Sequence, residues 1–71
     1  MNDAMVEKKC QEFLRTLKAL RGKRGLSTTQ LATLTGLKQP NIVRIETGVY
    51  KPNLETIIRL TEVLEAKLTL E

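Results

Sequence analysis

The chain contains the stretch STTQLATLTGLKQPNIVRIETG, from Ser27 to Gly48, which decides its fold. Apolar residues recur there at helical spacing, which predicts one helix from about Thr28 to Thr35 and a second from about Gln39 to Thr47. Between them lie Gly36 and Leu37. A glycine can adopt the left-handed backbone conformation that ends a helix, so the stretch predicts two short helices joined by a tight turn.

Local signals at the helix starts agree with this prediction. Ser27 followed by Gln30 has the spacing of a capping box, in which each side chain bonds the backbone amide of the other residue. Leu26 and Leu31 have the spacing of a hydrophobic staple. Pro40 falls in the first turn of the second helix, where a missing N–H costs little.

Each of the two helices is expected to bury one apolar stripe, made of Leu31, Leu34, Ile42 and Ile45. Two short helices that cross over a glycine turn form the helix-turn-helix, whose second helix enters the major groove of DNA. Residues 27–48 are therefore interpreted as a helix-turn-helix.

The same residues carry a family resemblance. The chain resembles the Cro/repressor family of helix-turn-helix proteins (xenobiotic-response-element type) through Leu31-Ala32, Gly36, Ile42, Ile45-Glu46 and Gly48. Lys51 to Thr56, KPNLET, also fits the start of that family's next helix, and the resemblance covers about Leu14 to Leu70. It implies an all-α fold, a compact four- to five-helix bundle of the lambda-repressor-like type.

A first helix is predicted from a cap at Asn2 or Asp3 to about Arg21. Gly22 and Gly25 are expected to end it, with Lys23-Arg24 as an exposed basic turn between them. Its apolar stripe comprises Val6, Cys10, Phe13, Leu14, Leu17 and Leu20. Because Cys10 lies in that stripe, we expect a buried small hydrophobe there and not a reactive thiol.

A fourth helix is predicted after a cap at Asn53. Its buried side would comprise Leu54, Ile57, Ile58, Leu60, Thr61 and Leu64. Members of the family usually end this helix with a glycine, whereas Glu65 stands at the matching position of this chain.

The last residues alternate in polarity, with Ala66, Leu68 and Leu70 on one side. This period of two predicts a β-strand over residues 66–71, and a lone strand needs a partner. We expect it to pair with the same strand of a second copy. The ending resembles HipB- and HigA-type antitoxins, whose short C-terminal strand serves the dimer. The alternatives are a frayed tail or, for Leu70-Glu71, a remnant of expression.

The composition predicts one domain over residues 1–71 and excludes several classes of site. The chain has no histidine and a single cysteine, so it can build neither a zinc site nor an internal disulfide. We expect no catalytic site, no metal and no cofactor. A reducing, cytoplasmic setting fits the cysteine content, and no apolar run is long enough for a membrane span.

The net charge of +4 is unevenly spread. Residues 1–51 hold ten Lys and Arg against four Asp and Glu, whereas residues 52–71 hold two against four. This asymmetry suggests that a polyanion is bound on one side. The alternative is a soluble domain with ordinary surface lysines.

Side chains suited to reading base edges cluster at the second helix of the motif, namely Lys38, Gln39, Asn41 and Arg44. These positions also match the base-contacting ones of the family. The family often has Ser or Thr where Lys38 stands, so Lys38 exchanges a helix cap for a candidate guanine contact. The alternative for Lys38 and Arg44 is solvated surface charge.

A phosphate contact is predicted at Thr28 and Thr29, because the start of a helix can bind an anion. The family resemblance implies a second clamp on the DNA backbone at Thr47, Tyr50 and Lys51. For Tyr50, packing on the core is the alternative. The resemblance further implies that the residues matching Arg21 and Glu46 form a partly buried ion pair that braces the motif.

The sequence thus favours a sequence-specific, double-stranded-DNA-binding transcriptional regulator, a homodimeric repressor on a near-palindromic operator. The alternative is the antitoxin of a toxin–antitoxin pair, which would bind and neutralise a toxin protein and regulate its own operon. An enzyme is excluded by the missing catalytic groups.

Overall fold

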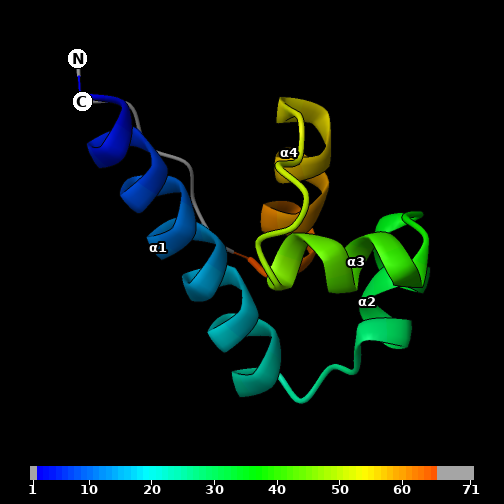
Figure 1. The fold of residues 1–71 in the computed structure, drawn as a ribbon. Coiled ribbons are helices and arrows are strands. Elements are labelled where there is room, and N and C mark those ends of the chain that lie inside the picture. The colour runs from blue at the N-terminus through cyan, green and yellow to red at the C-terminus, as the bar shows by residue number, and fades with distance from the viewer. Residues whose placement is uncertain (1, 66–71) are drawn as a thin grey trace.

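The computed structural model describes residues 2–65 of the chain, which form four helices (Figure 1). These are α1 (Asp3–Lys23), α2 (Thr28–Thr35), α3 (Gln39–Glu46) and α4 (Leu54–Val63). The predicted all-α helix-turn-helix bundle is confirmed. The strand predicted over residues 66–71, with Ala66, Leu68 and Leu70, lies outside the described residues. None of the four helices is long and apolar enough to cross a lipid bilayer.

Helix α1 begins at the predicted cap but ends later than expected. The Asn2 side-chain oxygen accepts hydrogen bonds from the amides of Ala4 (2.8 Å) and Met5 (3.3 Å). The helix continues through Gly22 to Lys23, so the prediction that Gly22 ends it is wrong. A glycine weakens a helix without breaking it, and here the turn comes only at Gly25, where φ is +70°.

Local signals fix both ends of α2. Ser27 Oγ accepts from the Gln30 amide (3.0 Å) and Gln30 Oε1 accepts from the Ser27 amide (2.8 Å), which confirms the capping box. Gly36 ends the helix with φ +75°, as predicted. The amide of Leu37 then donates to the Ala32 carbonyl (3.1 Å). The turn between the two motif helices is therefore specified by its own residues.

Helix α3 starts without a side-chain cap, because Lys38 at the N-cap has no suitable acceptor. It ends at Glu46, one residue before the predicted end, with Thr47 as its C-cap. Helix α4 begins as predicted, since Asn53 Oδ1 accepts from the Thr56 amide (2.9 Å).

Helix α4 ends without the glycine that the family usually has at this position. Glu65 itself adopts the left-handed conformation, with φ +57°. Arg24 secures this corner: its Nε donates to the Leu64 carbonyl (2.7 Å), and its Nη1 lies 3.3 Å from the Glu65 carboxylate. A cation at the C-terminal end of a helix is also favoured by the helix dipole.

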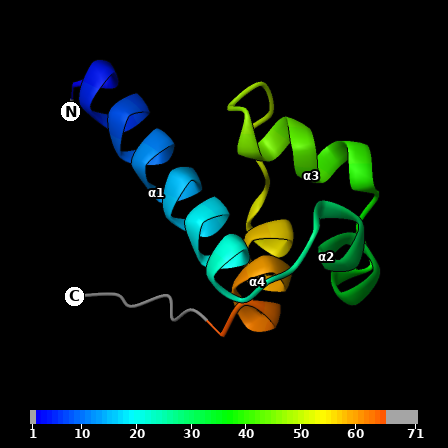
Figure 2. The ribbon, with the colours of Figure 1, turned by 90° about the horizontal axis from the view of Figure 1, so that it is seen from below.

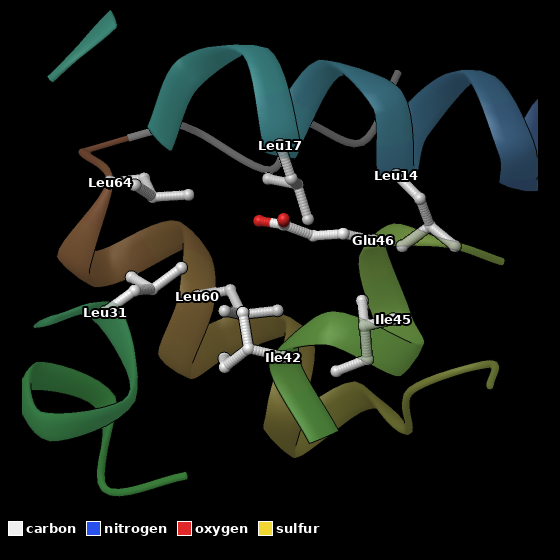
Figure 3. A pocket seen from close by; sticks show the side chains of 8 residues that line it. All are labelled: Leu14, Leu17, Leu31, Ile42, Ile45, Glu46, Leu60 and Leu64. Carbon is white, nitrogen blue, oxygen red and sulfur yellow. The ribbon is translucent and has the colours of Figure 1, made fainter. Parts of the chain in front are cut away.

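All four helices contribute to one hydrophobic core. Its buried members are Leu14, Leu17, Leu31, Ala32, Ile42, Ile45, Leu60 and Leu64. Figure 3 shows the side chains from α1, α2, α3 and α4 converging on this centre. The cavity left among them is about 10 Å³, which is too small for more than one water molecule.

Some residues predicted to be buried are exposed. On α2 the inward face comprises Leu31, Ala32 and Thr35, so Leu34 points outward and is 58% exposed. An eight-residue helix that packs on two neighbours can bury a narrow face only, and the spacing of its leucines did not show which one.

The same correction applies at the ends of α1 and α4. Residues 2–9 are exposed, because the first half of α1 extends beyond the other helices (Figures 1 and 2). Val6 is therefore 40% exposed and Cys10 only half-buried. On α4, Leu54 and Ile58 are 68% and 44% exposed, since this helix turns Leu60 and Leu64 toward the core instead.

A paired arginine and glutamate brace the bundle, as the family resemblance implied. Arg21 Nε and Nη2 donate to the two carboxylate oxygens of Glu46 at 2.6 Å and 2.9 Å. Arg21 Nη1 also donates to the Leu26 carbonyl (2.8 Å). The two side chains are 17% and 10% exposed, and Glu46 reaches from α3 toward Leu17 of α1 (Figure 3). The hydrogen bonds that Arg21 donates to Glu46 raise the pKa of Arg21 above its ordinary value.

Replacing Arg21 by methionine should lower the free energy of unfolding by about 3 kcal/mol, because the Glu46 carboxylate would lose its partner while remaining largely out of water. Urea denaturation followed by helical circular dichroism measures the change. The double variant Arg21→Met/Glu46→Leu should recover most of the loss. A single variant as stable as the parent would show that the pair contributes nothing.

Glu65→Gly should raise the free energy of unfolding by about 0.5–1 kcal/mol. The substitution removes the cost of a Cβ in the left-handed region, and this gain exceeds the added freedom of the unfolded chain. Glu65→Ala is the control, because it loses the same carboxylate but keeps the Cβ, and it should not stabilise. Equal melting temperatures for the two variants would contradict the account of this corner.

Candidate nucleic-acid interface

Helix α3 lies at one face of the bundle, with its apolar side against the other helices (Figures 1 and 2). Ile42 and Ile45 are buried, at 1% and 3% exposed. Of the residues predicted to contact bases, Lys38 at the N-cap and Arg44 are exposed, and Gln39 and Asn41 are half-buried beside the apolar side. None of the four side chains belongs to the buried core, so all of them are at least partly accessible.

A side-chain hydrogen bond links the starts of the two motif helices. Gln39 Nε2 donates to Thr28 Oγ1 at 3.0 Å. This bond uses one amide hydrogen of Gln39, so its amide oxygen and second hydrogen remain to pair with an adenine edge. The Thr28 hydroxyl accepts this bond and keeps its own hydrogen for another acceptor. A residue predicted to contact a base and one predicted to contact a phosphate thus position each other.

A second side-chain hydrogen bond lies on the outward face of α3, about one turn after Gln39. Arg44 Nη1 donates to Asn41 Oδ1 at 3.3 Å. The contact holds the guanidinium along the helix face, where its remaining donors can pair with a guanine or a phosphate.

Val43 is a residue that the sequence reasoning missed. It is 40% exposed and lies one turn after Gln39 on the outward side. Apolar side chains at such positions contact the methyl group of thymine. The signal was present in the spacing, because a helix that buries Ile42 and Ile45 turns Val43 away from the core.

The N-terminus of α2 provides a candidate phosphate contact. Backbone amides in the first turn of a helix have no partner within the helix. The capping box engages the amide of Gln30, which leaves the amides of Thr28 and Thr29 in the first turn. Thr29 is exposed and Thr28 half-buried. Two amides and two hydroxyls at a helix start are groups that can bind an anion, so the phosphate contact here stays a prediction.

In the loop after α3, most hydrogen-bond donors that could bind a DNA phosphate are already engaged within the chain. The amides of Gly48, Val49 and Tyr50 donate to carbonyls at the end of α3, at 3.0–3.2 Å. The Thr47 hydroxyl donates to the Val43 carbonyl (2.9 Å). These donors are already engaged, so a phosphate at this loop would have to bind the side chains of Tyr50 and Lys51. Tyr50 is 42% exposed and does not pack in the core.

Lys51 has a carboxylate partner that the sequence did not reveal. Its ammonium forms an ion pair with Glu7 of α1, which also accepts a hydrogen bond from Gln11 Nε2 (3.1 Å). The hydrogen bond from Lys51 holds the pKa of Glu7 below its ordinary value, and the same bond raises the pKa of Lys51. The positive charge of Lys51 is therefore already compensated by Glu7 before any phosphate binds.

The residues predicted to act on DNA thus fall into two groups. The start of α2 and the outward face of α3 come together through the bond between Gln39 and Thr28. The loop residues Thr47, Tyr50 and Lys51 follow the other end of α3, where two of the three are engaged within the chain.

Comparison with known proteins agrees with the helix-turn-helix fold. A family model described as a helix-turn-helix domain matches residues 12–71. An uncharacterized HTH-type transcriptional regulator from Haemophilus influenzae is 42% identical over 58 residues, which cover 82% of this chain and 59% of that protein. The chain thus spans less than two thirds of that relative's length. No solved structure matches the chain significantly. The match over most of the chain, together with α2, the turn at Gly36 and α3, shows that this chain belongs to the helix-turn-helix domain family.

Proposed function

We propose that this chain binds double-stranded DNA in a sequence-specific manner and regulates transcription as a dimeric repressor. The single observation that carries the proposal is the arrangement of α3. Its apolar side is anchored in the core by Ile42 and Ile45, and its polar side, from Lys38 to Arg44, is left open. A helix held in this way fits the major groove, which is wide enough to admit it.

Base recognition is assigned to four side chains of complementary chemistry. Lys38 and Arg44 carry donors for guanine, and Gln39 and Asn41 can pair with adenine through their amides. The hydrogen bond that Gln39 donates to Thr28 holds that amide at the N-terminal end of α3, the end that enters the groove in helix-turn-helix complexes. Val43 adds an apolar contact for a thymine methyl.

Phosphate contacts would set the position of α3 without reading sequence. The start of α2, with Thr28 and Thr29, is the stronger candidate because its amides are available. Tyr50 and Lys51 would hold the neighbouring phosphates on the other side of α3. Two copies bound to a near-palindromic operator would place their α3 helices in successive major grooves, about 34 Å apart.

The Haemophilus influenzae relative is an HTH-type transcriptional regulator, and this supports a regulatory role for the present chain. Repression and the dimer are our own extensions of that role. The antitoxin alternative depends on an acidic C-terminal part that would hold a toxin, and on the alternating residues 66–71, which lie outside the described residues. The antitoxin role and the toxin partner both stay predictions.

The test is selection of bound duplexes from a random pool, followed by affinity measurements with the selected site. We expect a two-fold-symmetric motif and an affinity that falls steeply with salt, because each phosphate contact releases counterions. A pool that yields no preferred sequence would contradict the proposed function.

Gln39→Ala should relax the preference at one base pair of the selected motif, at a cost of about 1–3 kcal/mol for the preferred base. The contrast is Thr29→Val, which removes a hydroxyl assigned to phosphate and should weaken binding to all sequences equally. Repeating the selection with each variant separates the two roles. An unchanged motif for Gln39→Ala would remove Gln39 from the base contacts.

A further inference from the structure

The carboxylate of Glu7 lies close enough to the Lys51 ammonium to compensate its positive charge. Glu7 is on α1 and Lys51 follows α3, so they are far apart in the sequence but form an ion pair in the fold. Both side chains are exposed, at 48% for Glu7 and 61% for Lys51. An exposed pair can exchange partners without any unfolding of the chain.

The Glu7 carboxylate also accepts a hydrogen bond at its other oxygen atom. Gln11, one turn along α1, donates from Nε2 to Glu7 Oε1. The Gln11 amide in turn packs on Gly48, so closely that a Cβ there would lie 2.8 Å from Gln11 Oε1. Glu7 is therefore positioned by a contact between α1 and the loop after α3, and it does not meet Lys51 by chance.

A DNA phosphate would compete with this carboxylate. Both are oxyanions that accept from a lysine ammonium, and the ammonium carries only one positive charge. A lysine already paired with a carboxylate attracts phosphate less strongly and releases fewer counterions when it binds. The carboxylate itself also repels any phosphate brought close to the loop.

We propose that Glu7 competes with a DNA phosphate for Lys51 and thereby limits the affinity of this chain for DNA. The inference rests on the proposed DNA-binding function and deepens it by assigning a restraining role to a residue outside the helix-turn-helix. In the free chain Glu7 binds the ammonium. In the complex the phosphate replaces it, and the cost of breaking the pair is subtracted from the binding energy.

The chain offers a matched control for a change in charge. Glu12 is also an exposed glutamate of α1, and within residues 2–65 it forms no ion pair. Glu7→Gln and Glu12→Gln therefore change the net charge equally, and only the first releases Lys51.

The experiment measures affinity for the selected duplex, over a series of salt concentrations, for the parent and both glutamine variants. Glu7→Gln should bind roughly two- to fivefold more tightly than Glu12→Gln, the range expected for loss of an exposed ion pair in the free state. Its salt slope should also be steeper, by up to about one unit. Melting curves of all variants confirm that each is folded.

A double variant isolates the pairwise effect. In a Lys51→Met background, Glu7→Gln should change the affinity no more than Glu12→Gln does, because no ammonium remains to be released. A gain for Glu7→Gln that persists in this background would overturn the proposal and leave only general repulsion.

The remaining outcomes are also decisive. If Glu7→Gln binds no better than Glu12→Gln, or binds more weakly, the restraining role is wrong while the DNA-binding function stands. If the parent chain binds no duplex at low salt, the proposed function is itself wrong and this inference falls with it.

Discussion

The ion pair between Arg21 and Glu46 is the interaction on which the rest of the structure depends. It joins the end of α1 to the end of α3 through two hydrogen bonds, and a third bond from Arg21 reaches the Leu26 carbonyl just before α2. The core behind it is small, with eight buried apolar side chains among residues 2–65. In such a chain a single largely buried pair fixes the orientation of α3, and hence which of its side chains face outward.

Within the described part of the chain, three arginines donate hydrogen bonds to backbone carbonyls. Arg24 donates to the Leu64 carbonyl at the end of α4, and Arg59 donates to the Thr35 carbonyl at the end of α2 (3.1 Å). The guanidiniums of Arg24 and Arg59 thereby satisfy carbonyls that helix ends leave open. Because Arg21, Arg24 and Lys51 pair with carboxylates of the chain, the charge asymmetry of the sequence overstates the positive charge that DNA would meet. Recognition depends instead on a few side chains at the starts of α2 and α3.

The sequence predicted most accurately the structural features that depend on residues close together in the chain. The capping box at Ser27, the left-handed turn at Gly36 and the cap at Asn53 each follow from contacts within a few residues. Periodicity was less reliable, because it indicates a helix without showing which narrow face a short helix buries, as Leu34 and Leu54 demonstrate. Contacts distant in sequence, such as that between Glu7 and Lys51, leave no local pattern, and only the fold brings them together.

The central claim is that the open side of α3 and the adjoining start of α2 form the DNA-binding surface. The most direct measurement is an NMR titration of the isotope-labelled chain with its selected duplex. The account predicts that the largest amide shift changes fall on residues 28–29 and 38–44, with small changes along the exposed side of α4. Changes concentrated on α4 or the first half of α1, with α3 unaffected, would contradict it.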